Sequence, residues 1–299
     1  MSVVMNLPAP PEGTCNYPLD EPAYESQLAF FKCATRIHDS EKLKAHLLRI
    51  QKKIYERFRY PCVWNFDFVR GKVINHPLFP EILTFKKERQ EEQNIFLDLG
   101  ASVASDVRQV ISEGWKREDI LAIEIDQEAI NLGYEMFIDS DRPIPCFIGN
   151  IFDPNIFDPT KALEKTSSRI DLFSLKDMNL LKRRVSFISC HYLFHLFDRD
   201  DQERLANYCA LLLSDEPGSS IFGTHKGSRE QGPQSLDHLP GTYWYNHSVE
   251  SWVQMWENIF NPETVKIVAE LKESNSQTQY KFLHPSEKIL WMSWSVTRL

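Results

Sequence analysis

The sequence predicts an α/β protein in which a doubly wound, Rossmann-like sheet of seven strands follows an N-terminal helical cap. From residue 94 onward, short apolar segments alternate with amphipathic segments of helical period. This alternation is typical of a mainly parallel sheet with helices on both faces. The last two apolar segments, 264–271 and 289–297, have no helical segment between them. They are therefore expected to pair antiparallel at the edge of the sheet.

Two units are expected, an arm and cap over residues 1–90 and the Rossmann-like domain over 91–299. In the cap, Asp39-Ser40 is a helix start, and apolar residues recur at spacings of three and four from there to Phe58, so the helix is expected to end near Arg59. The seven expected strands lie at 94–99, 120–125, 146–149, 185–190, 219–224, 264–271 and 289–297. The helices of the second unit are expected at 106–115, 127–137, 200–213 and 248–259.

The composition and charge of the chain argue against several classes of function. The chain has 299 residues, a net charge of −8 and a pI of about 5.6. A net-negative chain without a basic stripe is not expected to bind nucleic acid. No window approaches the ~20 apolar residues of a membrane span, and the N-terminus lacks the features of a secretory signal. The six cysteines form no CxxC pair, which favours reduced thiols in the cytoplasm over disulfides or a zinc site.

The segment FLDLGASVASDVRQV, residues 96–110, has the layout of a nucleotide-binding loop, with an apolar strand, an acid and a glycine before a polar helix. Gly100 is not followed by the further glycines of a G-x-G-x-x-G motif, which argues against an enzyme that binds a nicotinamide dinucleotide. No Lys-Ser/Thr pair follows, which excludes a phosphate-loop NTPase. In doubly wound sheets, ligands bind beyond the carboxyl ends of the strands, so the loop remains a candidate cofactor site.

The tips of the first three strands carry acids or an amide at a regular spacing. Asp98, Glu124 and Asn150 are each 26 residues apart, which is one βα unit per tip. A carboxylate at Glu124 can accept hydrogen bonds from the hydroxyls of a ribose. Asn150 precedes the apolar Ile151 and Phe152, a combination suited to the edge and faces of an adenine. These tips predict a site for a ribosylated cofactor.

With these loops in view, the chain resembles the class I S-adenosylmethionine-dependent methyltransferases. It is most similar to those of fungal meroterpenoid and polyketide biosynthesis, including the enzymes that form a methyl ester on a farnesylated aromatic acid. The resemblance runs from about residue 40 to the C-terminus. The segments that carry it are YPC (60–62), FLDLGASVASDVRQ (96–109), AIEID and LGYEMF within 122–137, NIFDP (150–154), FHLFDRDDQERLA (194–206), PGSSIFGT (217–224) and SVESWVQMWE (248–257).

The resemblance implies S-adenosylmethionine as cofactor. Asp98, Gly100 and Asp106 would frame its methionine part, Glu124 its ribose, and the Asn150 segment its adenine. The full set of cofactor-binding residues is then Asp98, Gly100, Ala101, Asp106, Glu124, Ile125, Asn150, Ile151 and Phe152.

The chain also departs from the family pattern. Relatives usually have glycine at the position of Ala104, glutamine at that of Ser105 and aspartate at that of Asn150. A methyl group at residue 104 would be strained if the backbone φ is positive there, and it would thicken the loop beside the cofactor. Cofactor binding is therefore expected to be weakened or lost.

Two histidines after the fourth strand are the catalytic candidates. His191 and His195 are four residues apart, so on a helical turn they would share a face. Either can act as a base for a phenol or enol, or be a structural histidine. The sequence has neither an HExxH pattern nor an evident third ligand, so no metal site is expected.

Two aromatic segments are candidates for the substrate pocket. Residues 60–69, with Tyr60, Trp64 and Phe66, can either plug the core or form the wall of a cleft. The loop 225–247, with Tyr243 and Trp244, can be a substrate lid or an ordinary surface excursion.

The sequence is consistent with two functions, which belong to different classes. The first is an O-methyltransferase acting on a bulky natural-product carboxylate, enol or phenol. The second is a methyltransferase-like enzyme that no longer methylates and instead catalyses a cyclisation, isomerisation or pericyclic step. Either way, the expected partner is a small molecule and neither nucleic acid nor a membrane. Exchange of the N-terminal arm between protomers would give a homodimer.

Overall fold

The computed structural model describes residues 17–163, 169–236, 239–273 and 289–299. Residues 235, 236 and 239–243 are described by their backbone alone. Residues 1–16, the first part of the expected arm, lie outside the described part. Among the described residues, no helix is both long enough and apolar enough to cross a bilayer.

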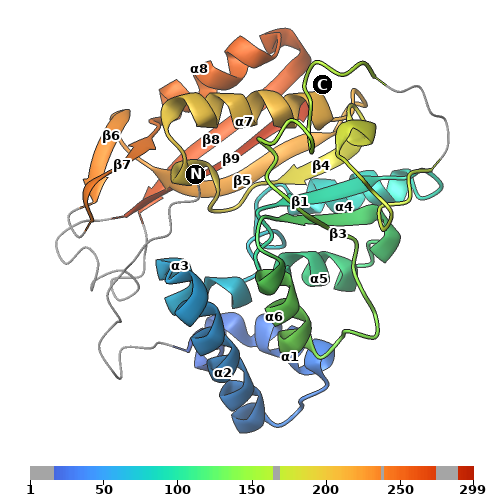
Figure 1. The fold of residues 1–299 in the computed structure, drawn as a ribbon, viewed down its shortest axis with the longest axis vertical. Helices are drawn as coiled ribbons and strands as arrows, with labels where there is room; N and C mark the ends of the chain where they lie inside the picture. The colour runs from blue at the N-terminus through green and yellow to red at the C-terminus, as the bar shows by residue number, and fades with distance from the viewer. Residues whose placement is uncertain (1–16, 164–168, 237–238, 274–288) are drawn as a thin grey trace.

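A seven-stranded sheet forms the centre of the molecule, with the order β3-β2-β1-β4-β5-β9-β8 (Figure 1). Strands β1 to β5 are parallel, and β9 pairs antiparallel with both β5 and β8. The predicted doubly wound sheet and its antiparallel edge pair are therefore confirmed. The strands are β1 Ile95–Leu99, β2 Ile120–Glu124, β3 Cys146–Ile148, β4 Val185–Ser189, β5 Ser220–Gly227, β8 Val265–Glu273 and β9 Leu290–Arg298.

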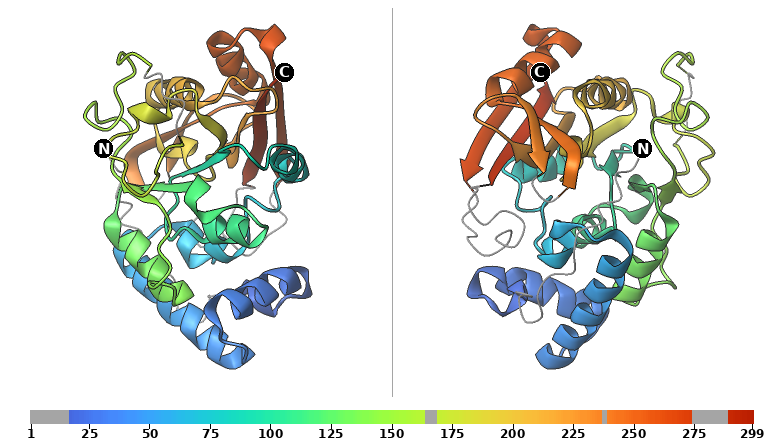
Figure 2. Two further views of the ribbon diagram at one scale, coloured as in Figure 1. Left: turned by 90° about the vertical axis from the view of Figure 1, so that its right-hand side faces the viewer. Right: turned by 60° about the vertical axis from the view of Figure 1, so that its left-hand side comes forward.

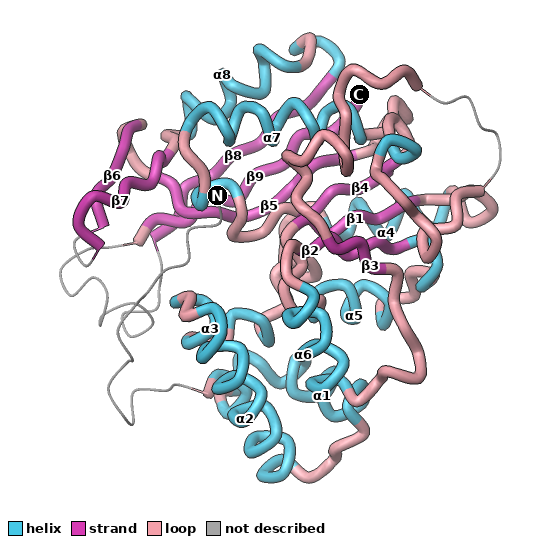
Figure 3. The backbone as a smooth tube through the Cα atoms, in the orientation of Figure 1, coloured by secondary structure: helices cyan, strands magenta, loops and turns pink. Residues whose placement is uncertain are grey.

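Helices cover both faces of the sheet (Figure 3). On one face, α7 and α8 bury Leu205, Trp252 and Trp256. On the other, α4 and α5 bury Ile82 and Val107. The helices are α1 Glu25–Thr35, α2 Ser40–Phe58, α3 Pro61–Trp64, α4 Phe79–Glu88, α5 Ser105–Ser112, α6 Gln127–Phe137, α7 Arg199–Leu212 and α8 Val249–Ile259. The apolar faces of these helices pack against the sheet, so the helices hold the carboxyl ends of its strands in fixed positions.

The cap is built around α2, which begins and ends where the sequence predicts. The Asp39 carboxylate accepts the backbone N–H of Lys42 at 2.9 Å, which caps the helix start. Arg59 ends the helix in a left-handed conformation. The apolar face of α2 packs with Met136 and Phe137 of α6 in one cluster. Figure 2 shows α1 and α2 lying beside α6, away from the sheet. The cap thus rests on the helix that follows the tip of β2.

The region after β5 differs from the expected loop. It forms a two-stranded antiparallel hairpin, with β6 Gly232–Leu236 and β7 Leu239–Asn246. Pro233 and Pro240 made these residues look like a loop. Proline is tolerated in such a ribbon because each of its strands has an unpaired edge. Helices α1 and α4 were likewise not anticipated.

Candidate active site

A cavity of about 310 Å³ lies at the carboxyl ends of the parallel strands. The nine residues predicted to bind a cofactor all line it, and so do both candidate histidines. They are Asp98, Gly100, Ala101, Asp106, Glu124, Ile125, Asn150, Ile151, Phe152, His191 and His195. The structure therefore brings the three strand tips together in one place, as the switch-point rule for doubly wound sheets requires. The volume is in the range of small-molecule sites, ~300–1,000 Å³.

Asp98 and Asp106 lie on the wall where the loop after β1 leads into α5. The register of β1 and β4 places Ser189 opposite Asp98, and its hydroxyl donates a hydrogen bond to the Asp98 carboxylate. Lys72 from the cap reaches Asp106, with Nζ 2.9 Å from Oδ2. The backbone N–H of Val73 donates to Asp106 Oδ1 at 3.0 Å. Residues of the cap thus occupy both oxygens of Asp106.

The pKa values of these two carboxyls are shifted in opposite directions. Burial, together with the nearby charge of Asp106, raises the pKa of Asp98. Burial would also raise the pKa of Asp106, but the charge and hydrogen bond of Lys72 outweigh it and lower that pKa. Burial likewise opposes the charge on Lys72, yet Asp106 raises its pKa overall. The Lys72–Asp106 pair is therefore ionised at neutral pH.

Glu124, the last residue of β2, is fixed by three backbone donors. Its Oε2 accepts the N–H of Ser102 at 2.7 Å. Its Oε1 accepts those of Ile125 at 2.8 Å and Asp126 at 3.2 Å. Burial raises the pKa of Glu124, although these three hydrogen bonds oppose the shift. A carboxylate offers about four lone-pair sites, so Oε2 is the oxygen that can accept a further donor from a ligand.

Asn150 lies two residues beyond β3, and the oxygen of its side-chain amide already accepts a hydrogen bond within the loop. Its Oδ1 accepts the backbone N–H of Phe152 at 3.0 Å. The amide NH₂ is therefore the group that can donate a hydrogen bond to a ligand. The Gly149 N–H donates to the Glu124 carbonyl at 2.9 Å, which ties the tips of β2 and β3 together.

Ala104 adopts a left-handed backbone conformation. This is the conformation in which a methyl group at residue 104 was expected to be strained and to weaken cofactor binding. Its φ is 52° and its ψ is 40°, a left-handed region that costs a residue other than glycine ~1–2 kcal/mol. Its methyl group, however, is fully buried and packs in the cluster with Val107. Ala104 is not among the residues that line the cavity. The expected thickening of the loop beside the cofactor is therefore wrong, and the strain is borne by the fold.

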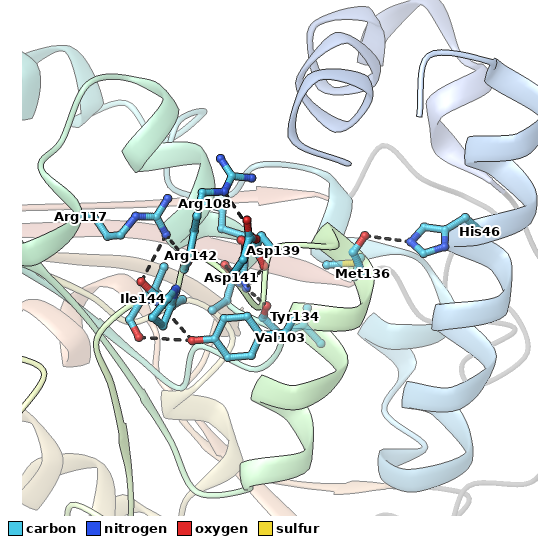
Figure 4. A network of polar contacts seen from close by, with 12 residues as sticks. His46, Val103, Arg108, Arg117, Tyr134, Met136, Asp139, Asp141, Arg142 and Ile144 are labelled. Carbon is cyan, nitrogen blue, oxygen red and sulfur yellow. Dashed lines mark hydrogen bonds and ion pairs between the residues drawn. The ribbon is translucent and has the colours of Figure 1, made fainter. Parts of the chain in front are cut away.

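A buried ion pair between α5 and the end of α6 supports this loop (Figure 4). Arg108 of α5 donates two hydrogen bonds to Asp139, at 2.8 and 2.9 Å. Its Nη1 also donates to the carbonyls of Val103 and Ala104, both at 3.2 Å. Removing one partner of such a pair costs about 3–5 kcal/mol. Arg108 therefore holds the loop in its strained form, a role that sequence analysis missed.

The histidines share the cavity for a different reason from the one expected. Tyr192 has a φ of 56°, and residues 194–196 form one turn of 3-10 helix. No α-helix therefore places His191 and His195 on a common face. Burial lowers the pKa of each to about 3, so both rings are neutral at physiological pH.

Their hydrogen bonding separates the two histidines. Neither ring nitrogen of His191 has a hydrogen-bond partner within the described part of the chain, although both are buried. His195 Nδ1 accepts the backbone N–H of Lys226 at 3.4 Å, which places the ring proton on Nε2. Unsatisfied buried polar groups of this kind cost free energy. His191 is therefore the residue whose environment points to a partner supplied by a ligand.

The aromatic segment of the cap serves both of the roles considered for it. Tyr60 lines the cavity. Trp64 instead packs on Tyr55, with ring centroids 5.2 Å apart, and Phe66 is fully buried. Neither Trp64 nor Phe66 lines the cavity, so the structure does not bring these two predicted substrate residues to it. The left-handed turn at Phe66, with a φ of 56°, places its ring in the core beside Tyr17.

The hairpin contributes one of its two expected residues. Trp244 lines the cavity, and its ring contacts that of His195 at 5.3 Å between centroids. The side chain of Tyr243 lies outside the described residues. The cavity wall also contains Lys226, which sequence analysis missed because no motif surrounds it. Its Nζ lies 5.3 Å from the centroid of the Trp244 ring.

Comparison with known proteins finds similar sequences among fungal methyltransferases. Residues 17–69 match the family model described as the meroterpenoid methyltransferase N-terminal domain. Methyltransferase ausD of Penicillium brasilianum is 27% identical over 259 residues, which cover 87% of this chain and 84% of the relative. The asnovolin E/chermesin D methyltransferase nvfJ of Aspergillus novofumigatus is 28% identical, with 74% of this chain and 71% of the relative covered.

A third relative is an O-methyltransferase, phiE, from a fungal species. It is 26% identical over 211 residues, covering 70% of this chain and 63% of the relative. The matches to these relatives extend well beyond the N-terminal domain, over 70–87% of this chain. Residues 17–69 thus match the N-terminal domain of meroterpenoid methyltransferases, and the chain as a whole is similar to fungal methyltransferases.

Proposed function

We propose that the chain is an S-adenosylmethionine-dependent O-methyltransferase of fungal secondary metabolism. Its acceptor would be a bulky, partly apolar intermediate, either a meroterpenoid or a polyketide, with a carboxylate, enol or phenol oxygen. One observation carries the proposal: Asp98, Glu124 and Asn150, from three neighbouring strand tips, converge on a single cavity.

The residues present fit this cofactor. Glu124 Oε2 can accept a ribose hydroxyl, and the Asn150 amide lies beside the apolar Ile151, as an adenine requires. Gly100 has a φ of 79°, and a Cβ added there would lie 3.2 Å from Leu193. The loop therefore needs glycine both for its backbone conformation and for the space beside Leu193.

The chemistry divides between cofactor and protein. When bound, S-adenosylmethionine supplies a methyl group on a sulfonium, which is already electrophilic. The protein then has mainly to hold the acceptor oxygen in line, and such alignment supplies a large part of a rate enhancement. A carboxylate acceptor needs no proton transfer. For a phenol or enol, the neutral His191 in the cavity wall can take the proton.

The acceptor side of the cavity combines aromatic rings with a cation. Trp244, Trp291 and Tyr192 line it together with Lys226. The rings of Tyr192 and Trp291 lie 4.6 Å apart between centroids. This surface suits a flat, largely apolar skeleton that carries a partly negative oxygen.

A second function is favoured by one observation. His191 is neutral, buried and without a described hydrogen-bond partner, and methylation of a carboxylate has no use for such a group. An enzyme that shuttles a proton in a cyclisation or isomerisation would use it. This alternative keeps the cavity but makes the cofactor unnecessary for the reaction.

Titration calorimetry separates the two functions. The methyltransferase proposal predicts that S-adenosylmethionine and S-adenosylhomocysteine both bind the purified chain with one site per chain. Heat should be measurable in the micromolar range of ligand. The absence of heat with either nucleoside at high micromolar concentration would contradict the proposal and favour the alternative.

Substitution of His191 tests its part in proton handling. His191→Ala is expected to slow methyl transfer to phenols about tenfold, less than the ~10²–10⁴ of a base whose pKa matches the working pH, because burial holds the pKa of His191 at about 3. Transfer to carboxylic acids should change much less. The measurement is the transfer of a labelled methyl group from S-adenosylmethionine to a panel of aromatic acids and phenols. His38→Ala, an exposed residue of the cap, is the control. Equal losses with both acceptor classes would make His191 a structural residue.

A further inference from the structure

Resting on the proposed function, we propose that Lys72 binds the carboxylate of the cofactor's methionine end and that Asp106 positions it there. The methionine end carries an ammonium and a carboxylate on one carbon. Its site therefore needs an anion and a cation close together. Lys72 and Asp106 both line the cavity, and their Nζ and Oδ2 atoms are 2.9 Å apart.

The ammonium of Lys72 is held in place but not fully used. It has three donors, and the Asp106 carboxylate takes one of them. The Asp67 carbonyl is a second, weaker partner at 3.4 Å. Nζ also lies 5.7 Å from the centroid of the Tyr192 ring, which lines the same cavity. One N–H thus remains for a ligand in the cavity, and the side chain keeps 20% of its surface exposed for this contact.

Asp106 is better suited to hold Lys72 than to bind the ligand. Its Oδ2 contacts Lys72, and its Oδ1 accepts the Val73 N–H at 3.0 Å. Each oxygen of Asp106 thus already has one donor from the cap, and the donor on Oδ2 is the cation itself. Asp98, on the same wall, has one described donor, the Ser189 hydroxyl. Asp98 is thus the carboxyl left for the ammonium, and Lys72 is the cation for the carboxylate.

The other cation of the cavity wall lies in a different environment. Among the described lining residues, Lys72 and Lys226 are the lysines, and no arginine is present. Lys226 lies beside the Trp244 ring and donates its backbone N–H to His195. These are residues of the acceptor side. Lys72 also faces Tyr192 of that side, but its ion pair is with Asp106, which follows the loop after β1. The position next to the cofactor loop favours Lys72.

A purely structural role is the competing interpretation. Lys72 would then only tie the cap to α5, and its loss would leave Asp106 buried without its ion pair. A ligand that lacks the carboxylate distinguishes the two interpretations. Decarboxylated S-adenosylmethionine keeps the adenosine, the sulfonium and the ammonium, so it lacks only the group that Lys72 is proposed to bind.

The test measures the affinities of both ligands by calorimetry in the full chain. The unsubstituted chain is expected to bind S-adenosylmethionine at least tenfold more tightly than its decarboxylated form, since a charge-assisted hydrogen bond is lost. Lys72→Met is expected to abolish this preference: the affinity for S-adenosylmethionine falls about tenfold or more, and that for the decarboxylated form stays within about threefold. Lys44→Met, which removes an exposed ion pair with Asp20, should keep the preference.

Two further variants guard against loss of the fold. Lys72→Gln can still donate to Asp106 but carries no charge, so it should also lose the preference. Lys72→Arg keeps the charge and should retain it. The proposal is overturned if the unsubstituted chain binds both ligands equally, if Lys72→Met keeps the preference, or if Lys72→Met weakens both ligands alike. If the unsubstituted chain binds neither ligand, it is the proposed function that fails.

Discussion

Replacing Glu124 with alanine is expected to weaken binding of S-adenosylmethionine by ten- to a hundredfold. Glu124 Oε2 has capacity for one donor beyond the Ser102 N–H, and the proposed donor is a ribose hydroxyl. A hydrogen bond to a charged group contributes about 1.5–3 kcal/mol, and each 1.4 kcal/mol is about tenfold in affinity. Titration calorimetry of the variant measures the loss directly.

Part of this loss would come from the loop itself, so a matched set is needed. Glu124→Gln keeps the size of the side chain but removes the charge, and it should lose most of the affinity as well. Glu128→Ala removes an exposed carboxylate of α6, four residues further along the chain, and should leave binding unchanged. If Glu124→Ala bound the nucleoside as tightly as the unsubstituted chain, the assignment of the tip of β2 to the ribose would be wrong.

The fold is expected to lose stability steeply as the pH falls from about 6.5 to about 5.5. Among the described residues, five histidines are buried and have depressed pKa values, and burial is the main cause in each case. They are His76 at about 4, His191 at about 3, His195 at about 3, His247 at about 4, and His225, whose pKa lies well below the usual range. In the unfolded chain each would titrate near ~6.5.

The sign follows from proton linkage. Below pH ~6.5 the unfolded chain binds protons that the folded chain excludes, so the free energy of unfolding falls as the pH falls. These histidines therefore contribute stability that is fully present above pH ~6.5 and is lost towards their folded pKa values. Each loses about 1.4 kcal/mol for every pH unit below that point. Asp98 and Glu124 act in the opposite direction, because burial raises their pKa values.

The net loss at pH 5.5 is expected to be on the order of 3–5 kcal/mol, a large share of the ~5–15 kcal/mol of a typical domain. Urea unfolding followed by tryptophan fluorescence at several pH values measures it. His247→Gln should reduce the pH slope by about one proton, whereas His38→Gln, at an exposed site, should not. A free energy of unfolding that stays constant over this pH range would show that the histidines are not excluded from protonation.

Sequence analysis succeeded where a property is local or periodic. The spacing of apolar residues predicts the sheet, the helix α2 and the antiparallel edge pair. The carboxyl ends of parallel strands meet at one edge of a sheet. For that reason, Asp98, Glu124 and Asn150 could be placed together without knowledge of any contact. The cavity then collects all nine of the residues proposed for a cofactor.

The sequence did not predict the features that depend on contacts between residues far apart in the chain. Lys72 and Asp106 lie 34 residues apart, and Arg108 and Asp139 lie 31 apart. Nothing in the local pattern pairs such charges. The aromatic segment of the cap was ambiguous for a related reason. A left-handed turn at Phe66 decides which rings face the core, and the sequence around a residue other than glycine gives no sign of such a turn.

The central claim is that the three strand tips hold a single adenosyl cofactor. A crystal structure of the chain grown with S-adenosylhomocysteine tests it most directly. We expect the ribose at Glu124, the adenine between Ile125 and Asn150, and the amino-acid end beside Lys72. A nucleoside bound elsewhere, or none bound at a saturating concentration, would contradict it.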